Sequence, residues 1–145
     1  KRPFAVEMQA LASRSYLAMP RRTALGFDLN RLNLLLAVLE KRLGVQLGQS
    51  DIYAKTGGGL KLSDPGLDLG LVAAVLSSWY DRPLPPRAVF WGELDLSGRI
   101  RPVSGHDARL KQARRLGYDP IFHPPGEGRG IATLKDFQRA LFGAP

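Results

Sequence analysis

One leucine-rich segment constrains the fold more strongly than any other feature of the sequence. Leucines recur at helical spacing between residues 29 and 43, with an aspartate before the first and a glycine after the last. Asp28 can accept a hydrogen bond from a free amide of the first turn, and Gly44 can adopt the left-handed conformation that ends many helices. The pattern therefore predicts a helix over 29–43. Leu34 and Val38 widen its apolar face, so we expect this helix to pack on more than one side.

The rest of the chain predicts short strands and further helices. Asp64 and Pro65 carry the signals of a helix start, and this helix is expected to run to about residue 80. Two more helices are expected at 107–116 and after Thr133. Strands are expected at 5–11, 22–27, 88–94, 100–103 and 120–123, with a turn at 95–98 and a tight hairpin over 51–63 around three glycines. Because there is no regular βαβ repeat and no linker, we expect an α+β (mixed α/β) fold in a single domain, 1–145.

Two segments look like a catalytic frame without its catalyst. They run from Gly59 to Gly70 and from Gly98 to Asp107, and we call them together the peptidase-like frame. They resemble the two active-site segments of the Lon peptidase domain, of which one carries a nucleophilic serine and the other the lysine that activates it. The matched positions here are Leu67 and Asp107. Since a leucine is no nucleophile and a carboxylate cannot act as the neutral amine of a dyad, we expect no catalytic residue.

Other polar residues near the frame offer weaker chemistry. Ser63 and Ser104 lie in the two segments, and Lys61 could approach one of them, but neither serine occupies the matched position. Turn and cap-proximal roles account for both serines. His106 adjoins the matched lysine position and has no placed nucleophile to serve as a base. The glycines 57–59 do not form a phosphate-binding loop, because the lysine that follows them is displaced by one residue and precedes leucine.

Composition and charge favour a polyanionic partner. The 145 residues contain 21 lysines and arginines against 13 acidic residues, for a net charge of +8. This balance attracts polyanions without identifying one. The absence of cysteine removes disulfides, thiolate metal sites and cysteine nucleophiles, and two histidines do not make a metal site. With no long apolar run and no secretory core at its start, the chain is expected to be a cytoplasmic protein or a piece excised from one.

Arginine supplies fifteen of the 21 basic residues, which points to phosphate. A guanidinium makes fixed, bidentate hydrogen bonds to phosphate, and few aromatic residues interleave with these charges, so the duplex backbone is favoured over stacking on single strands. Arg31 lies in the first turn of the leucine-rich helix, where a cation needs an acidic neighbour. Asp68 is expected as a first-turn acid or in an ion pair between subunits. The candidate DNA-binding residues are Arg21, Arg22, Arg31, Lys55, Lys61, Arg99 and Arg101.

A longer run carries a closer resemblance. Residues 15–42, from Ser-Tyr-Leu-Ala-Met-Pro-Arg-Arg to Leu-Glu-Lys-Arg, resemble the C-terminal domain of the bacterial RadA (Sms) family, and the likeness continues through 6–11, 64–65 and 98–104. Members of that family are RecA-related ATPases of recombination and DNA repair. The resemblance implies a Lon protease proteolytic-domain-like (ribosomal protein S5 domain 2-like) fold without proteolysis. It also implies a hexameric ring that binds double-stranded DNA, with single-stranded DNA as a second candidate, and promotes branch migration with RecA.

The same resemblance implies a zinc finger and an ATPase core that this stretch does not contain. The family's four-cysteine zinc finger and ATPase motifs are absent from the 145 residues, so zinc, ATP and magnesium are expected only in other domains. We expect neither a cofactor nor an enzyme activity here. Two alternatives stay open. One is a purely structural ring scaffold with incidental basic charge, and the other is a serine–lysine peptidase with a relocated dyad, which Ser63→Ala would inactivate.

Overall fold

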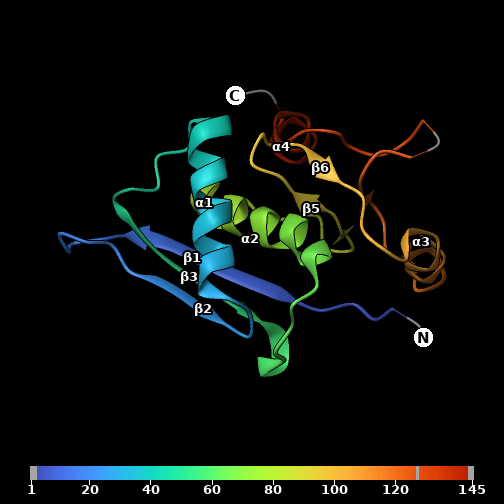
Figure 1. Cartoon of the computed structure of the whole chain (residues 1–145), viewed down its shortest axis with the longest axis horizontal. Helices are drawn as coiled ribbons and strands as arrows, with labels where there is room; N and C mark the ends of the chain where they lie inside the picture. The colour runs from blue at the N-terminus through green and yellow to red at the C-terminus, as the bar shows by residue number, and fades with distance from the viewer. Residues whose placement is uncertain (1–2, 127, 144–145) are drawn as a thin grey trace.

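A three-stranded sheet with two helices on one face forms the centre of the molecule (Figure 1). The computed structural model describes residues 3–126 and 128–143. Strands β1 (Met8–Arg14), β2 (Arg22–Leu25) and β3 (Ser50–Thr56) have the order β1-β3-β2, with β3 antiparallel to β1 and parallel to β2. Every second residue of β3 is buried. The sheet therefore has one core face and one face that is partly open to water.

Helix α1 (Leu29–Leu43) confirms the prediction from the leucine spacing. The Asp28 side chain accepts a hydrogen bond from the Asn30 amide at 3.1 Å, and Gly44 ends the helix at φ 71°. The helix packs against β2, against helix α2 (Asp68–Tyr80) and against helix α4 (Leu134–Phe142). The expectation that it packs on more than one side is therefore confirmed, although Leu34 remains 39% exposed.

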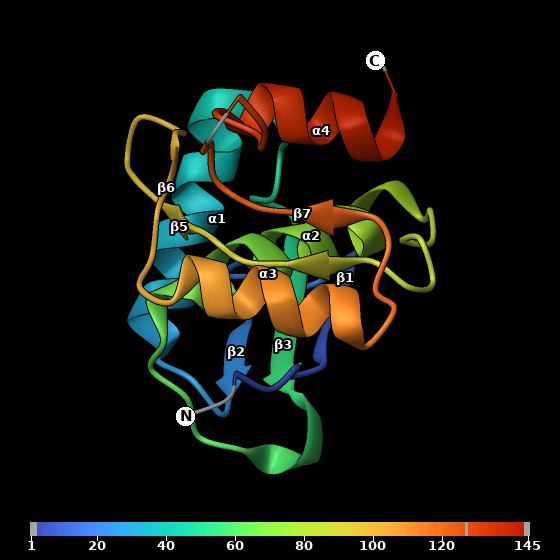
Figure 2. The ribbon, with the colours of Figure 1, turned by 90° about the vertical axis from the view of Figure 1, so that its right-hand side faces the viewer.

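The second half of the chain adds two small sheets and two helices to the same core (Figure 2). Strand β4 (Val89–Phe90) pairs in parallel with β7 (Ile121–Phe122), and β5 (Glu93–Leu94) pairs antiparallel with β6 (Ile100–Arg101). Helix α3 (His106–Arg115) lies beside them, and α4 is capped by Thr133 as predicted. One hydrophobic cluster extends from α1 to the side chains of α4. The chain is thus a mixed α+β fold with a single core.

The predicted strand over 88–94 is wrong, because the chain changes partners in its middle. Residues 89–90 pair with β7, whereas residues 93–94 pair with β6. Gly92 separates them at φ 151°, and a Cβ there would come within 2.8 Å of the Ile100 side chain. The first strand is also displaced: it begins at Met8 rather than at residue 5. Met8 is paired with Thr56, where β3 ends, so the residues before Met8 have no partner strand.

The predicted hairpin over 51–63 is wrong as well. Residues 50–56 do form β3, but β3 already has β1 on one edge and β2 on the other, so no edge remains for a returning strand. The glycines instead form a 3-10 turn, η1 (Gly57–Gly59). The chain then continues to the end of β2, where the Leu62 amide donates a hydrogen bond to the carbonyl of Gly26, the residue after β2, at 2.7 Å.

Candidate functional site

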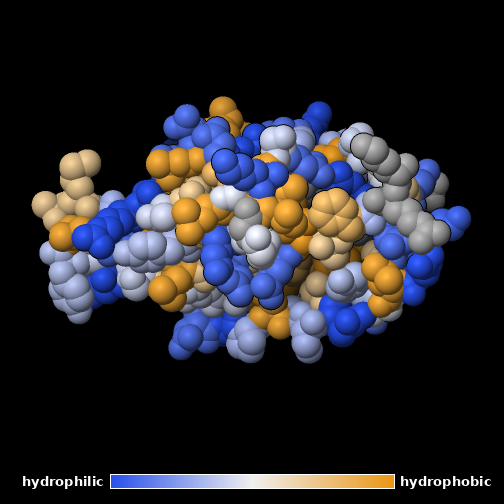
Figure 3. All heavy atoms as spheres, turned by 90° about the horizontal axis from the view of Figure 1, so that it is seen from below, coloured by the Kyte–Doolittle hydropathy of each residue, from blue (hydrophilic) through white to orange (hydrophobic). Residues whose placement is uncertain are grey.

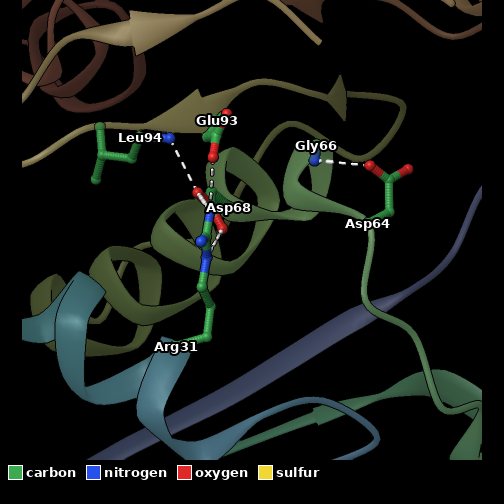
Figure 4. A network of polar contacts seen from close by, with 6 residues as sticks. All are labelled: Arg31, Asp64, Gly66, Asp68, Glu93 and Leu94. Atoms are coloured by element: carbon green, nitrogen blue, oxygen red, sulfur yellow. Dashed lines mark hydrogen bonds and ion pairs between the residues drawn. The ribbon is translucent and has the colours of Figure 1, made fainter. Parts of the chain in front are cut away.

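The first segment of the peptidase-like frame is a tight turn at the start of α2 (Figure 4). Asp64 accepts a hydrogen bond from the Gly66 amide at 2.8 Å, and a 3-10 turn, η2 (Pro65–Leu67), leads directly into the helix. Leu67, at the position of the missing nucleophile, is half-buried and lines a groove of about 700 Å³. The local fold is therefore one that could present a residue to a groove, but the residue presented is apolar.

The second segment places Asp107 away from that groove. Asp107 is exposed in the first turn of α3 and lines a different hollow of about 810 Å³. The two positions matched to the dyad therefore do not face a common cavity. Ser63, Ser104 and Lys61 are all exposed, and no side-chain hydrogen bond among the described residues joins the lysine to either serine. The part of the chain that the structure describes contains no assembled dyad.

An arginine that the sequence did not single out joins the two segments. Arg109 of α3 contacts the Asp64 carboxylate through Nη2 at 2.8 Å and donates from Nε to the Ser104 carbonyl at 3.1 Å. A Cβ on Gly66 would come within 2.8 Å of the guanidinium, so a larger residue there would displace the end of the Arg109 side chain. Arg109 thus holds the frame together where the dyad would act. The sequence did contain a signal for this role, because the second segment ends at Asp107 in the first turn of α3 and Arg109 follows two residues later on the same helix.

His106 faces an aromatic neighbour rather than a reacting group. Its Nδ1 accepts a hydrogen bond from Trp91 Nε1 at 3.2 Å, and its ring lies against His123, with 5.0 Å between the ring centroids. His123 Nδ1 is bonded in turn to the Pro124 carbonyl at 2.7 Å. The Nδ1 atom of His106 is therefore directed at Trp91 and not at a candidate nucleophile. Among the residues that the structure describes, no three histidine or acidic side chains could hold a metal ion.

Arg31 is paired inside the molecule, on the face of α1 that meets α2 (Figure 4). Its Nε donates to Asp68 Oδ1 at 2.7 Å, its Nη2 contacts Asp68 Oδ2, and Glu93 lies 3.6 Å away. The backbone amide of Leu94 also donates to Asp68, at 2.9 Å. Asp68 lies in the first turn of α2, which confirms the first of the two roles expected for it. It is only 3% exposed, so the alternative of a pairing between subunits is wrong and the partner is Arg31 of the same chain.

Burial and hydrogen bonding act in opposite directions on this pair. Burial raises the pKa of Asp68, while the hydrogen bonds from Arg31 and Leu94 oppose that increase. The hydrogen bond to Asp68 in turn raises the pKa of Arg31. We treat the pair as ionised, because all three hydrogen bonds to the Asp68 carboxylate are donated to it. The acidic neighbour that the helix dipole requires near Arg31 is therefore Asp68.

The other candidate DNA-binding residues do not converge on one surface. Arg22 is tied to the protein by hydrogen bonds to the carbonyls of Leu47, at 2.9 Å, and Ser50. Exposed Arg21 lies at the end of the β1–β2 loop. Two further members are exposed near the η1 turn, and the last two are exposed at the β5–β6 turn; these are Lys55, Lys61, Arg99 and Arg101. The η1 and β5–β6 turns lie on opposite sides of the sheet-and-helix layer (Figure 1).

Arg42 extends the basic group at the β5–β6 turn. It lies in the last turn of α1, where its Nε donates to the Leu96 carbonyl at 3.2 Å and its side chain packs over Gly98. Arg99 and Arg101 are exposed on either side of buried Ile100. We call Arg42, Arg99 and Arg101 the hairpin cluster. Sequence reasoning missed Arg42, although basic residues in the last turn of a helix are a recognisable pattern.

The chain is similar to proteins named DNA repair protein RadA. It is 40% identical over 146 residues to that of Rickettsia bellii, 46% over 126 residues to that of a Synechocystis strain, and 41% over 137 residues to that of Streptococcus pneumoniae. These alignments cover 97%, 87% and 94% of this chain. The chain belongs to the RadA family. It spans 33%, 25% and 33% of those relatives' lengths, and no protein-family model matches it.

In this RadA-family chain, an aspartate holds the β5–β6 turn that carries the hairpin cluster. Asp95 Oδ1 accepts hydrogen bonds from the Ser97 hydroxyl at 2.7 Å, the Arg99 amide at 2.9 Å and the Ser97 amide at 3.0 Å. These bonds lower the pKa of Asp95 from its ordinary value of 3.8, with the Ser97 hydroxyl contributing most.

None of the helices among the described residues of this chain has the length and apolar composition that a membrane span requires.

Acid is expected to weaken this turn. Because the pKa of Asp95 is lower in the folded chain than in the unfolded chain, its stabilising effect is fully present above the unfolded value of 3.8 and is lost as pH falls through the folded value. Asp95→Asn should therefore lower the melting temperature at about pH 6 and lower it less at about pH 2.5. Thermal unfolding followed by circular dichroism across this range measures the effect. A constant difference at every pH would contradict it.

Proposed function

We propose that this chain is a Lon-like, non-proteolytic domain that binds duplex DNA through backbone phosphates and supports ring assembly of a RadA-type repair ATPase. Such an assembly would be a hexamer acting with RecA in branch migration of recombination intermediates. The relatives' name, DNA repair protein RadA, supports the DNA partner. The Lon-like fold and the lack of proteolysis are supported by the frame, in which leucine and aspartate replace the dyad and face different hollows.

The observation that carries the DNA proposal is the hairpin cluster. Three arginines from α1 and the β5–β6 turn are exposed side by side, and none has an acidic partner in an ion pair among the described residues. Two of them flank one buried residue on a strand, which fixes the direction of both side chains. Guanidinium groups on one face are well suited to phosphate oxygens and read no base sequence. We therefore assign the phosphate contacts to this cluster.

Fluorescence anisotropy with a labelled duplex tests the assignment. We expect affinity to fall steeply with salt, because each phosphate contact releases counterions and adds about 0.9 to the slope of log affinity against log salt concentration. A triple variant replaces the whole cluster, with Arg42→Glu, Arg99→Glu and Arg101→Glu. It should bind all DNA sequences at least about 10-fold more weakly, and its slope of log affinity against log salt concentration should be shallower by about 2–3. Arg31 is unsuitable for charge reversal, since a glutamate there would face Asp68.

A matched control separates this effect from a loss of overall charge. Lys111, Arg114 and Arg115 are exposed on α3, so reversing all three removes the same charge from another surface. This control should keep most of the salt slope of the unaltered chain. Equal loss in both triple variants would show that net charge alone attracts DNA, and no binding at low salt would refute the DNA proposal. If only the double variant Lys55→Glu with Lys61→Glu lost DNA binding, the phosphate contacts would lie at the η1 turn instead.

A further inference from the structure

The loop between β1 and β2 projects from one end of the molecule (Figure 1) and carries exposed apolar side chains. In this loop, residues 15–20, Tyr16 is 90% exposed, Met19 84% and Leu17 48%. Single exposed apolar residues are ordinary on a protein surface, but three within four positions form a contiguous patch, which marks a contact site. Figure 3 shows apolar side chains gathered at this projecting end. We call residues 15–20 the apolar loop.

The groove beside Leu67 lies toward the other end of the longest axis, between α3 and the extended residues before β1 (Figures 1 and 2). Its volume of about 700 Å³ is within the range of ligand-binding sites. Its lining is mainly apolar and includes Leu67, Leu84, Val89, Phe90 and Leu116. Residues 3–7 form one wall of the groove, and the Gly57 amide of η1 donates a hydrogen bond to the Glu7 carbonyl of that wall at 2.7 Å. The groove is thus an open, mainly apolar site that could receive apolar side chains.

The net charges that border the loop and the groove are opposite in sign. Two exposed arginines, Arg14 and Arg21, flank the apolar loop, and the Arg14 guanidinium lies 5.9 Å from the Tyr16 ring centroid. Two acids, Glu7 and Asp64, and one arginine, Arg109, line the groove, and Arg109 pairs with Asp64 at 2.8 Å, so Glu7 supplies the remaining negative charge. Glu7 is exposed and has no ion-pair partner among the described residues. A loop that carries arginines beside its apolar side chains therefore complements this groove in both polarity and charge.

We propose that the apolar loop of one copy of this chain docks into the Leu67 groove of a second copy. This inference rests on the ring assembly proposed above and supplies its contact. The loop and the groove are different surfaces at different ends of the molecule, so the contact is head-to-tail, and its repetition builds a ring or a filament. It also gives Leu67 a role, because an apolar side chain suits a groove that receives tyrosine and methionine better than a serine would.

Disulfide trapping tests the contact directly, because the chain contains no cysteine of its own. Met19→Cys protein is mixed with Leu116→Cys or Phe4→Cys protein under mild oxidation. Leu116 and Phe4 line the groove and are 42% and 68% exposed, so neither change disturbs the core. We expect cross-linked pairs, since a disulfide requires Cα atoms within about 7 Å. The control pairs Met19→Cys with Lys135→Cys on α4, which should cross-link at background level.

Sedimentation velocity measures the strength of the association. Tyr16→Ser with Met19→Ser should raise the dissociation constant of self-association at least about 10-fold, as loss of an anchoring side chain does at interfaces. Leu96→Ser is the matched control, because Leu96 is an apolar residue, 63% exposed, at the tip of the β5–β6 turn. It should associate as the unaltered chain does. Circular dichroism confirms that each variant is folded.

The outcomes separate this contact from the function on which it rests. Self-association without the expected cross-links would leave ring assembly standing and overturn the contact. A chain that stays monomeric and gives no cross-links would overturn both, whereas DNA binding, measured separately, would be unaffected by either result. If the loop variants lose DNA binding but associate normally, the loop contacts DNA instead and the proposal is wrong. Cross-links together with weakened association support it.

Discussion

Asp68→Ala is expected to lower the free energy of unfolding by about 3–5 kcal/mol, the usual cost of removing one partner of a buried ion pair. Asp68 is 3% exposed and accepts hydrogen bonds from Arg31 and from the Leu94 amide. Without the carboxylate, the partly buried guanidinium loses its main acceptor and the Leu94 amide loses the side chain to which it donates. Three elements, α1, α2 and β5, meet at this point, so the loss affects the packing of all three.

Urea unfolding followed by far-ultraviolet circular dichroism measures this loss. Glu93→Ala is the matched control, because Glu93 is 3.6 Å from the same arginine but its side chain is 43% exposed; it should cost no more than about 1 kcal/mol. A double variant, Arg31→Met with Asp68→Leu, replaces both charges and should recover much of the stability. An Asp68→Ala chain as stable as the Glu93→Ala chain would show that the pair contributes little.

Phe137→Ala is expected to cost about 3–5 kcal/mol, as removal of a buried phenylalanine does in other cores. Phe137 is 0% exposed on α4. Its ring meets Phe90 and Phe122 edge-on, with centroid separations of 5.9 Å and 5.6 Å. These rings belong to β4 and β7, so this one side chain joins the last helix to the small parallel sheet. An alanine leaves a cavity that the two strands can fill only in part.

Phe4→Ala provides the control for that prediction, because it removes the same atoms from a ring that is 68% exposed. Its effect on the urea midpoint should stay within about 0.5 kcal/mol. A shared slope of free energy against urea concentration would show that both variants unfold in the same way as the unaltered chain. Equal stability of Phe137→Ala and Phe4→Ala would mean that α4 does not share the core.

Helix α1, through the Arg31–Asp68 pair and through Arg42, connects the two surfaces for which we propose contacts. Asp68 follows Leu67 directly and thereby anchors the first segment of the frame to α1. The other end of α1 carries Arg42, which holds the β5–β6 turn through the Leu96 carbonyl. The groove and the hairpin cluster are thus fixed to the two ends of one helix. A ring contact at one end and a phosphate contact at the other would be held in a constant relative position.

Elements with local signals were predicted well. The caps of α1 and α4, the turn that begins α2 and the β5–β6 hairpin each depend on residues a few positions apart, and each formed where expected. Strand pairing was predicted poorly. Nothing near Lys61 or Ala88 in the sequence shows that β3 has both edges filled or that the chain changes partners at Gly92.

The sequence by itself determined the family of the chain, its α1 helix and the residues at the two positions matched to a dyad, because motifs and caps are properties of neighbouring residues. Only the tertiary structure decided which basic residues are available to a partner. Arg31 pairs with Asp68, 37 positions away in the chain, and Arg22 donates to the Leu47 carbonyl, 25 positions away, whereas Arg42 reaches the β5–β6 turn at Leu96, 54 positions away. A charge is free or paired according to what lies beside it in space, and that depends on long-range packing which no local pattern records.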